Sequence, residues 1–255
     1  MVYRRMDLNK KGSNIKLIAL DMDGTLLNEN HEVTDENRQA IKEAERRGVF
    51  VVLSTGRSLK TARDYVISLE LSSYLVTVNG GEIWGPDGEL VEVNPVDTEH
   101  IQWMYELSRK HKTGFWATSS EDVWRDNMPD DLFSQKWLKF GFHIEEDEIR
   151  ESVLTELKEK GLFEISNSSL KNIEVNALGI NKAKGLQKVC ELLGISMENV
   201  MAVGDSLNDI AMITEAGLGI AMGNAQDVVK EAADDVTGTN RESGVAQSIH
   251  KWVLV

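Results

Sequence analysis

Short apolar runs that end abruptly in polar clusters are the feature that most constrains how this chain can fold. Three such runs, at residues 15–20, 49–53 and 74–78, are separated by stretches with the periodicity of amphipathic helices. Continuous Val, Ile and Leu without alternation is typical of strands buried on both faces, as in a parallel sheet covered by helices. The order strand, helix, strand, helix, strand with short turns therefore predicts an α/β fold built on a parallel sheet.

The middle of the chain has a different pattern. The stretch GEIWGPDGELVEV, which starts at Gly81, alternates around a Pro-Asp-Gly turn, and helices and short strands follow it. Such alternation is typical of an antiparallel hairpin. From Asn181 onward, short apolar runs again alternate with stretches of helical periodicity. We therefore expect a doubly wound, Rossmann-like core from residues 1–82 and 179–255, with an inserted α+β domain over residues 83–178. Residues 1–14 are expected to form a flexible extension.

The composition limits the classes of partner and location. The 255 residues include 28 Lys and Arg against 42 Asp and Glu, which gives a net charge of −14. This charge disfavours nucleic acid and anionic membranes as partners. No apolar stretch approaches the roughly 20 residues of a membrane span. The single cysteine, Cys190, cannot form an internal disulfide, which fits a reducing compartment. We expect a cytoplasmic protein that is a monomer or weak homodimer.

Polar clusters follow three of the predicted strands. Asp21 and Asp23 stand directly after the first run, Thr55 follows the second, and Asp205 follows a run over residues 200–203. In open parallel sheets, ligands bind in the crevice beyond the carboxyl ends of the strands. The sequence therefore predicts that these side chains meet in one crevice.

The residue types in that crevice indicate a metal and a phosphate. With Asp209, one turn after Asp205, the crevice holds four carboxylates, a concentration of negative charge that favours a bound cation. Oxygen ligands without Cys or His select a hard ion such as Mg²⁺. Lys182 and the backbone amides after Asp21 and Thr55 supply positive potential for an anion. Together these groups point to phosphoryl transfer.

The motifs DMDGTLL, STGR, a following Lys and GDSLND, in this order around an insertion, resemble the haloacid dehalogenase superfamily. More narrowly, the chain is similar to the Cof-type phosphatases, in which a type IIB α/β cap lies between the second and third motifs. The resemblance runs from about residue 15 to the end. It implies a phosphatase that uses Mg²⁺ and forms an aspartyl phosphate on a small-molecule phosphate monoester, such as a sugar phosphate or a phosphorylated cofactor or precursor.

The resemblance also implies a role for each motif residue. Asp21 is the implied nucleophile and Asp23 the implied general acid and base. The implied metal ligands are the Asp21 carboxylate, the Asp23 carbonyl, Asp205 and Asp209. The phosphate is bound by the amide of Met22, Thr55, Gly56, Lys182 and Asn208. Arg57 is either a surface ion pair or a contact to the substrate or the cap.

Two departures concern the third motif. The family often has Gly directly after the motif lysine, whereas this chain reads INKAKGL. The distance forward to LLGI favours Lys182, and Lys184 is the alternative. The usual Pro a few residues earlier is replaced by Ala177.

Other functions are compatible with parts of the pattern. A sugar phosphomutase with the same cap is the main alternative, because no residue in the sequence decides between water and a second sugar as the acceptor. A phospho-receiver also uses Asp, Mg²⁺, Thr and Lys, but it needs neither the carboxylate at Asp23 nor a long insertion. A metabolite-binding regulator without turnover is disfavoured by the complete motif set.

Specificity is expected to come from the inserted domain, because the crevice contacts only the phosphoryl group and the metal. The candidate contacts in that domain are Trp116, Trp124, Arg125, Lys139 and His143.

Overall fold

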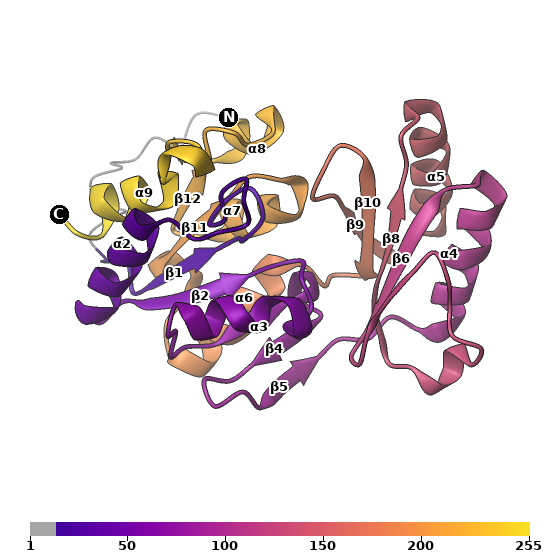
Figure 1. Cartoon of the computed structure of the whole chain (residues 1–255), viewed down its shortest axis with the longest axis horizontal. Helices are drawn as coiled ribbons and strands as arrows, with labels where there is room; N and C mark the ends of the chain where they lie inside the picture. Colours follow the sequence, from indigo (N-terminus) through magenta and orange to yellow (C-terminus); the bar gives the residue numbers. More distant parts are fainter. Residues whose placement is uncertain (1–13) are drawn as a thin grey trace.

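Two β-sheets organise residues 14–255, the part of the chain that this computed structural model describes (Figure 1). The predicted extension over residues 1–14 falls almost wholly outside the described residues. The first sheet has eight strands in the order β13-β12-β11-β1-β2-β3-β4-β5. Its parallel strands are β1 (Leu17–Leu20), β2 (Phe50–Ser54), β3 (Leu75–Thr77), β11 (Val200–Gly204), β12 (Leu218–Ala221) and β13 (Asp235–Val236).

Helices cover this sheet in two groups. One group places α2 beside α9, and the other places α6 beside α7. In α2, Thr34 caps the first turn by accepting a hydrogen bond from the amide of Asn37, and the apolar stripe is buried. The predicted doubly wound α/β fold is therefore confirmed. The helices are α2 (Asp35–Arg46), α3 (Leu59–Ser68), α6 (Lys182–Leu193), α7 (Ile210–Glu215), α8 (Asp227–Ala232) and α9 (Gly244–Trp252).

The hairpin of β4 (Glu82–Trp84) and β5 (Leu90–Val93) belongs to the first sheet. The sequence pattern predicts that the insertion begins at residue 83. In the structure, however, β4 pairs antiparallel with β3, and β5 pairs with β4. The reason is a tight reversal at Val78–Gly80, where three successive residues have positive φ and turn the chain back along the strand it has just left.

The second sheet is antiparallel, with the order β7-β6-β8-β10-β9. Its two helices, α4 (Thr98–His111) and α5 (Asp147–Lys160), lie on the side away from the first sheet (Figure 1). Because side chains alternate along a strand, one face packs on these helices and the other faces the first sheet. The strands are β6 (Gly114–Ser119), β7 (Val123–Arg125), β8 (Trp137–His143), β9 (Phe163–Ser166) and β10 (Asn172–Ala177).

Each sheet has its own hydrophobic core. The first is formed by the strands and helices of the eight-stranded sheet, and the second by α4, α5 and the helix-facing side of the five-stranded sheet. Trp137, Phe140 and Phe142 on β8 are fully buried in the second core. Among the described residues, no helix has the length and apolar character needed to cross a membrane.

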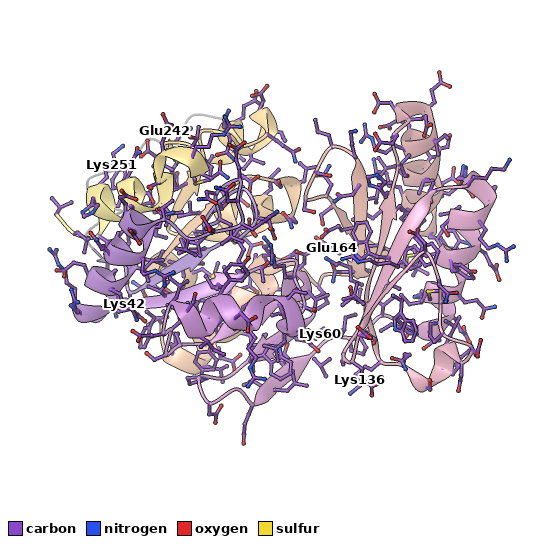
Figure 2. The ribbon with its side chains drawn as sticks, viewed as in Figure 1. Lys42, Lys60, Lys136, Glu164, Glu242 and Lys251 are labelled. Atoms are coloured by element: carbon purple, nitrogen blue, oxygen red, sulfur yellow. The ribbon has the colours of Figure 1, made fainter. Side chains whose placement is uncertain are left out.

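Polar side chains connect the two halves of the molecule. Lys60 Nζ, on α3, donates to Asp122 Oδ1 at 3.0 Å, and Asn181 Nδ2 donates to Glu164 Oε1 at 3.0 Å. Figure 2 shows Lys60 on the side of the first sheet, and Glu164 and Lys136 on the facing side of the second sheet. The second sheet therefore lies against the carboxyl ends of the core strands, over the predicted crevice.

Candidate active site

Three carboxylates gather where β1 and β11 end. Asp21 follows β1, Asp205 follows β11, and Asp209 ends the short helical turn Leu207–Asp209. Since β1 and β11 are neighbouring parallel strands, their carboxyl ends lie side by side. One oxygen from each carboxylate lies within 4.8 Å of the other two. The structure thus brings together three of the four predicted carboxylates.

Lys182 lies among these carboxylates and is fully buried. Its Nζ donates to Asp21 Oδ1 at 2.5 Å and to Asp209 Oδ1 at 2.6 Å. Lys182 is the first residue of α6, and the side chain of Asn181 caps that helix through the amide of Lys184. The Lys184 side chain is exposed to solvent. The structure therefore places Lys182, and not Lys184, at the carboxylate cluster.

The cluster shifts the proton affinity of its members. Burial raises the pKa of Asp21 well above its ordinary value; Lys182 lowers it, and Asp209 and Asp205 raise it further. Burial and the neighbouring Asp209 raise the pKa of Asp205 to about 6. The two carboxylates raise the pKa of Lys182 against the opposing effect of burial, so the ammonium stays charged. The Lys182 ammonium is thus the cation of a cluster that contains three carboxyl groups, those of Asp21, Asp205 and Asp209.

Asp209 has no free carboxylate oxygen. Oδ1 accepts the hydrogen bond from Lys182, and Oδ2 accepts from the amides of Asp205 and Ser206 at 2.9 and 3.0 Å. Asp205 accepts from the hydroxyls of Thr25 and Ser206 at 2.9 and 3.0 Å. These contacts fix the loop after β11, so Asp209 acts on the geometry of both Lys182 and Asp205.

Gly24 allows the loop after β1 to approach Asp205. Its φ is +82°, and a Cβ at this position would lie 2.6 Å from Asp205 Oδ2. A larger residue here would be strained in backbone conformation and would displace the carboxylate.

Asp23 lies apart from the three clustered carboxylates and pairs with Arg57. The Arg57 guanidinium donates from Nε to Asp23 Oδ2 at 2.7 Å and from Nη2 to Oδ1 at 2.5 Å. The Asp23 side chain is 46% exposed, whereas Asp21 is buried. The other side of the guanidinium lies over the Tyr65 ring. Arg57 therefore forms an ion pair with another predicted site residue, and it also lines the cavity between the two sheets.

Of the predicted phosphate-binding residues, Gly56, Arg57 and Asn208 line the cavity between the two sheets. Thr55 is buried, and its hydroxyl accepts from the amide of Arg57 at 3.1 Å. Asn208 Nδ2 donates to Asn79 Oδ1 at 3.2 Å, while Asn208 Oδ1 is buried without a hydrogen-bond partner. The Met22 side chain is fully buried in the core, which leaves only its backbone for the site.

A buried polar network that the motifs do not predict joins the second sheet to the crevice. Lys139 Nζ donates to the Gly56 carbonyl at 2.8 Å and to Glu174 Oε2 at 3.1 Å. Glu174 also accepts from Asn79 Nδ2 at 2.6 Å and from Ser168. Burial alone would raise the pKa of Glu174, but Lys139 and these hydrogen bonds outweigh it and lower the pKa. The sequence feature that could have indicated Glu174 is its charged side chain within the strand pattern NIEVNA.

A cavity of about 280 Å³ lies between the two sheets. From the core it is lined by Asp21, Asp23, Gly56, Arg57 and Asn208, among others. From the second sheet it is lined by Trp116, Arg125, Lys139 and Glu174, among others. Two of the candidate cap contacts lie elsewhere: Trp124 packs against the second core, and His143 pairs with Glu145.

The carboxylate cluster fits a hard divalent cation. Its ligand atoms are all carboxylate oxygens within 4.8 Å of one another, without His or Cys among them. Oxygen-only sites of this kind suit Mg²⁺, Ca²⁺ or Mn²⁺. Burial raises the pKa values of Asp21 and Asp205, and the neighbouring carboxylates raise them further, so a bound cation would favour the ionised forms of both groups.

Comparison with known proteins agrees with this geometry. The model of the haloacid dehalogenase-like hydrolase family matches residues 18–152 and 125–249. The 5-amino-6-(5-phospho-D-ribitylamino)uracil phosphatase YcsE of Bacillus subtilis is 59% identical over 98% of this chain and 100% of its own length. A second Bacillus subtilis phosphatase of the same name, YitU, is 30% identical over 92% of this chain and 97% of its own length.

Solved structures show the same fold. A haloacid dehalogenase-like hydrolase from B. subtilis superposes with a TM-score of 0.85 at 26% identity, over 92% of this chain and 99% of its own. One from Bacteroides thetaiotaomicron superposes with a TM-score of 0.78 at 30% identity, over 93% and 99% of the two chains. The chain therefore belongs to the haloacid dehalogenase-like hydrolase family, and it is a phosphatase, a hydrolase of small phosphate monoesters.

Proposed function

We propose that this protein is a Mg²⁺-dependent phosphatase that releases inorganic phosphate from 5-amino-6-(5-phospho-D-ribitylamino)uracil. The proposed substrate rests on the 59% identity to a phosphatase of that name, which extends over essentially the whole of both chains. The cluster of Asp21, Asp205 and Asp209 around Lys182 supports the phosphoryl chemistry.

In the first half of the reaction, Asp21 is the nucleophile. One of its carboxylate oxygens attacks phosphorus and forms an acyl phosphate while the bond to the ribityl oxygen breaks. Asp23 donates a proton to that oxygen, so the leaving group departs as a neutral alcohol. Lys182, Thr55, Asn208 and the amides of Met22 and Gly56 hold the phosphoryl oxygens.

In the second half, water attacks the acyl phosphate. Asp23, now ionised, takes a proton from the water, phosphate leaves, and the Asp21 carboxylate is restored. Before substrate binds, Arg57 holds the Asp23 carboxylate at the wall of the cavity.

The proposed Mg²⁺ would be held by the carboxylates of Asp21 and Asp205 and by the Asp23 carbonyl, with Asp209 alongside. When bound, it neutralises charge between the nucleophile and the phosphate. Asp209 supports the site mainly by positioning, because both of its oxygens already accept hydrogen bonds.

A panel of phosphate esters tests the substrate. Phosphate release should be measured for the ribitylaminouracil phosphate, D-ribitol 5-phosphate, ribose 5-phosphate and glucose 6-phosphate. We expect the first ester to have the highest kcat/KM. Equal or better hydrolysis of the sugar phosphates would contradict the substrate, and isomerised sugar phosphate without phosphate release would identify a mutase.

Replacing Asp23 with Asn should have an effect that depends on the leaving group. For a ribityl ester, whose alkoxide is a poor leaving group, we expect a roughly 10²–10⁴-fold loss of kcat/KM, the usual contribution of general acid catalysis. The loss should be much smaller for p-nitrophenyl phosphate, which needs no proton. Equal losses for both esters would argue against the assigned role.

Mg²⁺ should stabilise the protein more at pH 7.5 than at pH 5. The folded-state pKa of Asp205, about 6, lies above its ordinary value of 3.8. The metal-free protein is therefore most stable with this group protonated and loses that contribution as the pH rises through 6. At pH 7.5 the Asp205 carboxylate is ionised and available to Mg²⁺. At a concentration of one hundred times Kd, binding contributes about 2.7 kcal/mol, or roughly 5–10 °C in Tm.

Thermal unfolding with and without Mg²⁺ at the two pH values checks this prediction, with chelator added to the metal-free samples. Turnover should vanish in chelator and return with Mg²⁺. The same Tm increase at both pH values, or full turnover without bound metal, would contradict the metal site.

We further propose that the chain consists of a phosphatase core and an inserted cap domain. The pairing of β4 and β5 with the first sheet favours a first boundary after Val93 rather than at 82/83, and the second remains near residue 178. A cytoplasmic location and a monomer or weak homodimer, without nucleic-acid partners, are part of the same proposal. Sedimentation at several concentrations tests the oligomeric state.

A further inference from the structure

The face of the second sheet that looks toward the core carries the side chains available to the leaving group. Along β6, Phe115 and Ala117 pack into the second core, so Trp116 between them points the other way. Trp116 is paired with Gly141 on β8 and with Arg125 on β7. Directly opposite residues of antiparallel strands share a face. Trp116, Gly141 and Arg125 therefore form one row across the sheet, on the side of the cavity.

The Trp116 indole lies on Gly141. A Cβ built at Gly141 would lie 2.2 Å from both Cε2 and Cζ2 of the indole and 2.6 Å from Cδ2. Three ring atoms thus lie within 2.6 Å of that Cβ position, which means that the ring covers the glycine. The absence of a side chain at residue 141 allows this arrangement. The indole remains partly exposed and lines the cavity that also reaches Asp21.

Arg125 is the cation beside this ring that is free to bind a ligand. Within residues 14–255, its guanidinium has no hydrogen bond, ion pair or ring contact, and the side chain is exposed at the cavity wall. The other cations of the cavity are already engaged: Lys139 binds Gly56 and Glu174, and Arg57 binds Asp23.

From this arrangement we infer that Trp116 and Arg125 form the subsite that receives the planar heterocycle of the leaving group. The inference rests on the proposed substrate and adds the residues that recognise it. The uracil ring stacks on the exposed face of the Trp116 indole. The Arg125 guanidinium, which offers several N–H donors in one plane, donates to the carbonyl oxygens of the ring. The ribityl chain spans the distance from this subsite to the phosphoryl group at Asp21.

The experiment compares two esters that share the ribityl phosphate and differ only in the heterocycle. For the wild type and each variant, kcat/KM is measured with the ribitylaminouracil phosphate and with D-ribitol 5-phosphate, and the ratio of the two values is taken. Trp116→Ala should lower this ratio roughly tenfold or more, the size of a lost base-stacking contact. Trp116→Phe keeps an aromatic face and should retain most of the ratio. Arg125→Met should lower it by roughly tenfold, as for a lost charge-assisted hydrogen bond.

A second experiment measures binding of the heterocycle without turnover of the heterocyclic ester. The dephosphorylated compound, 5-amino-6-(D-ribitylamino)uracil, should inhibit hydrolysis of D-ribitol 5-phosphate competitively, with a higher inhibition constant in Trp116→Ala. Arg109→Met, which removes an exposed arginine on α4, is the matched control and should leave both the ratio and the inhibition constant at the wild-type values.

The outcomes separate the subsite from the substrate. If the wild type prefers the heterocyclic ester and Trp116→Ala loses activity on both esters equally, the tryptophan only supports the sheet and the subsite is wrong, while the proposed substrate stands. If the wild type shows no preference for the heterocyclic ester and is not inhibited by the dephosphorylated compound, both the subsite and the substrate are wrong.

Discussion

Replacing Asp21 with Asn is expected to reduce phosphate release to below about 1% of the wild-type rate, because the proposed reaction proceeds through a covalent intermediate on its carboxylate. Asp21 is buried at the end of β1, bonded to Lys182 and within reach of Asp205 and Asp209. Asparagine has nearly the same shape, but its amide is not a nucleophile toward phosphorus. The loss should appear with every ester tested, whatever the leaving group.

The fold should survive this substitution. Burial and the adjacent carboxylates raise the pKa of Asp21, which means that its ionised form is unfavourable in the metal-free protein. A neutral amide removes that repulsion, so the Tm without metal should equal or exceed the wild-type value, while the increase caused by Mg²⁺ should shrink. Asp87→Asn, in the exposed turn between β4 and β5, is the matched control and should behave as wild type. Turnover by Asp21→Asn that persists after repurification would remove Asp21 from the nucleophile role.

The parallel strands of the first sheet were predictable because their sequence signals are local. Each buried run, the Thr34 cap of α2 and the polar residues at the strand ends stand in the sequence where the structure uses them. Parallel neighbours then bring Asp21 and Asp205 together without further information. Ser58, a residue type that often caps helices, stands at the cap position of α3, but its side chain makes no capping hydrogen bond.

The position of the β4–β5 hairpin was not predictable from the same signals. The alternating pattern predicts a hairpin correctly, but it carries no information about which sheet the hairpin joins. That choice depends on the reversal at Val78–Gly80, where Val78, a β-branched residue, has a φ of +52°. A β-branched residue rarely adopts this conformation, so sequence preferences do not reveal the turn.

Some polar contacts of the site were predictable from the sequence, and others were not. Motif spacing brings the carboxylates and Lys182 into one crevice, but it does not predict the Arg57–Asp23 pair or the network around Glu174. These contacts join residues separated by 34 and 95 positions, and they form only when the second sheet or the loop after β2 is in place. The motifs mark Asp23 and Arg57 as site residues, but no spacing in the sequence indicates that they pair with each other or that Glu174 is buried.

Replacing Lys182 with Met should lower kcat/KM by roughly 10²-fold or more, the size of a lost group that stabilises charge in the transition state. It should also destabilise the protein strongly, because Asp21 and Asp209 would then face each other without a cation. Removing one partner of a buried ion pair typically costs about 3–5 kcal/mol. Saturating Mg²⁺ should restore part of the Tm but not the rate, since the metal relieves the repulsion without replacing the ammonium beside the phosphoryl oxygens.

Lys184→Met is the matched control for this variant, because Lys184 lies two residues along the same helix with an exposed side chain. It should retain wild-type kcat/KM and Tm. Circular dichroism at the assay temperature separates lost chemistry from unfolding, and the double variant Lys182→Met with Asp209→Asn provides a second check. That double variant removes one of the two opposed carboxylates, so it should recover stability relative to Lys182→Met and still lack activity. A greater loss from Lys184→Met than from Lys182→Met would move the phosphate-binding role to Lys184 and leave Lys182 as a buried counter-ion whose only function is to hold Asp21 and Asp209 together.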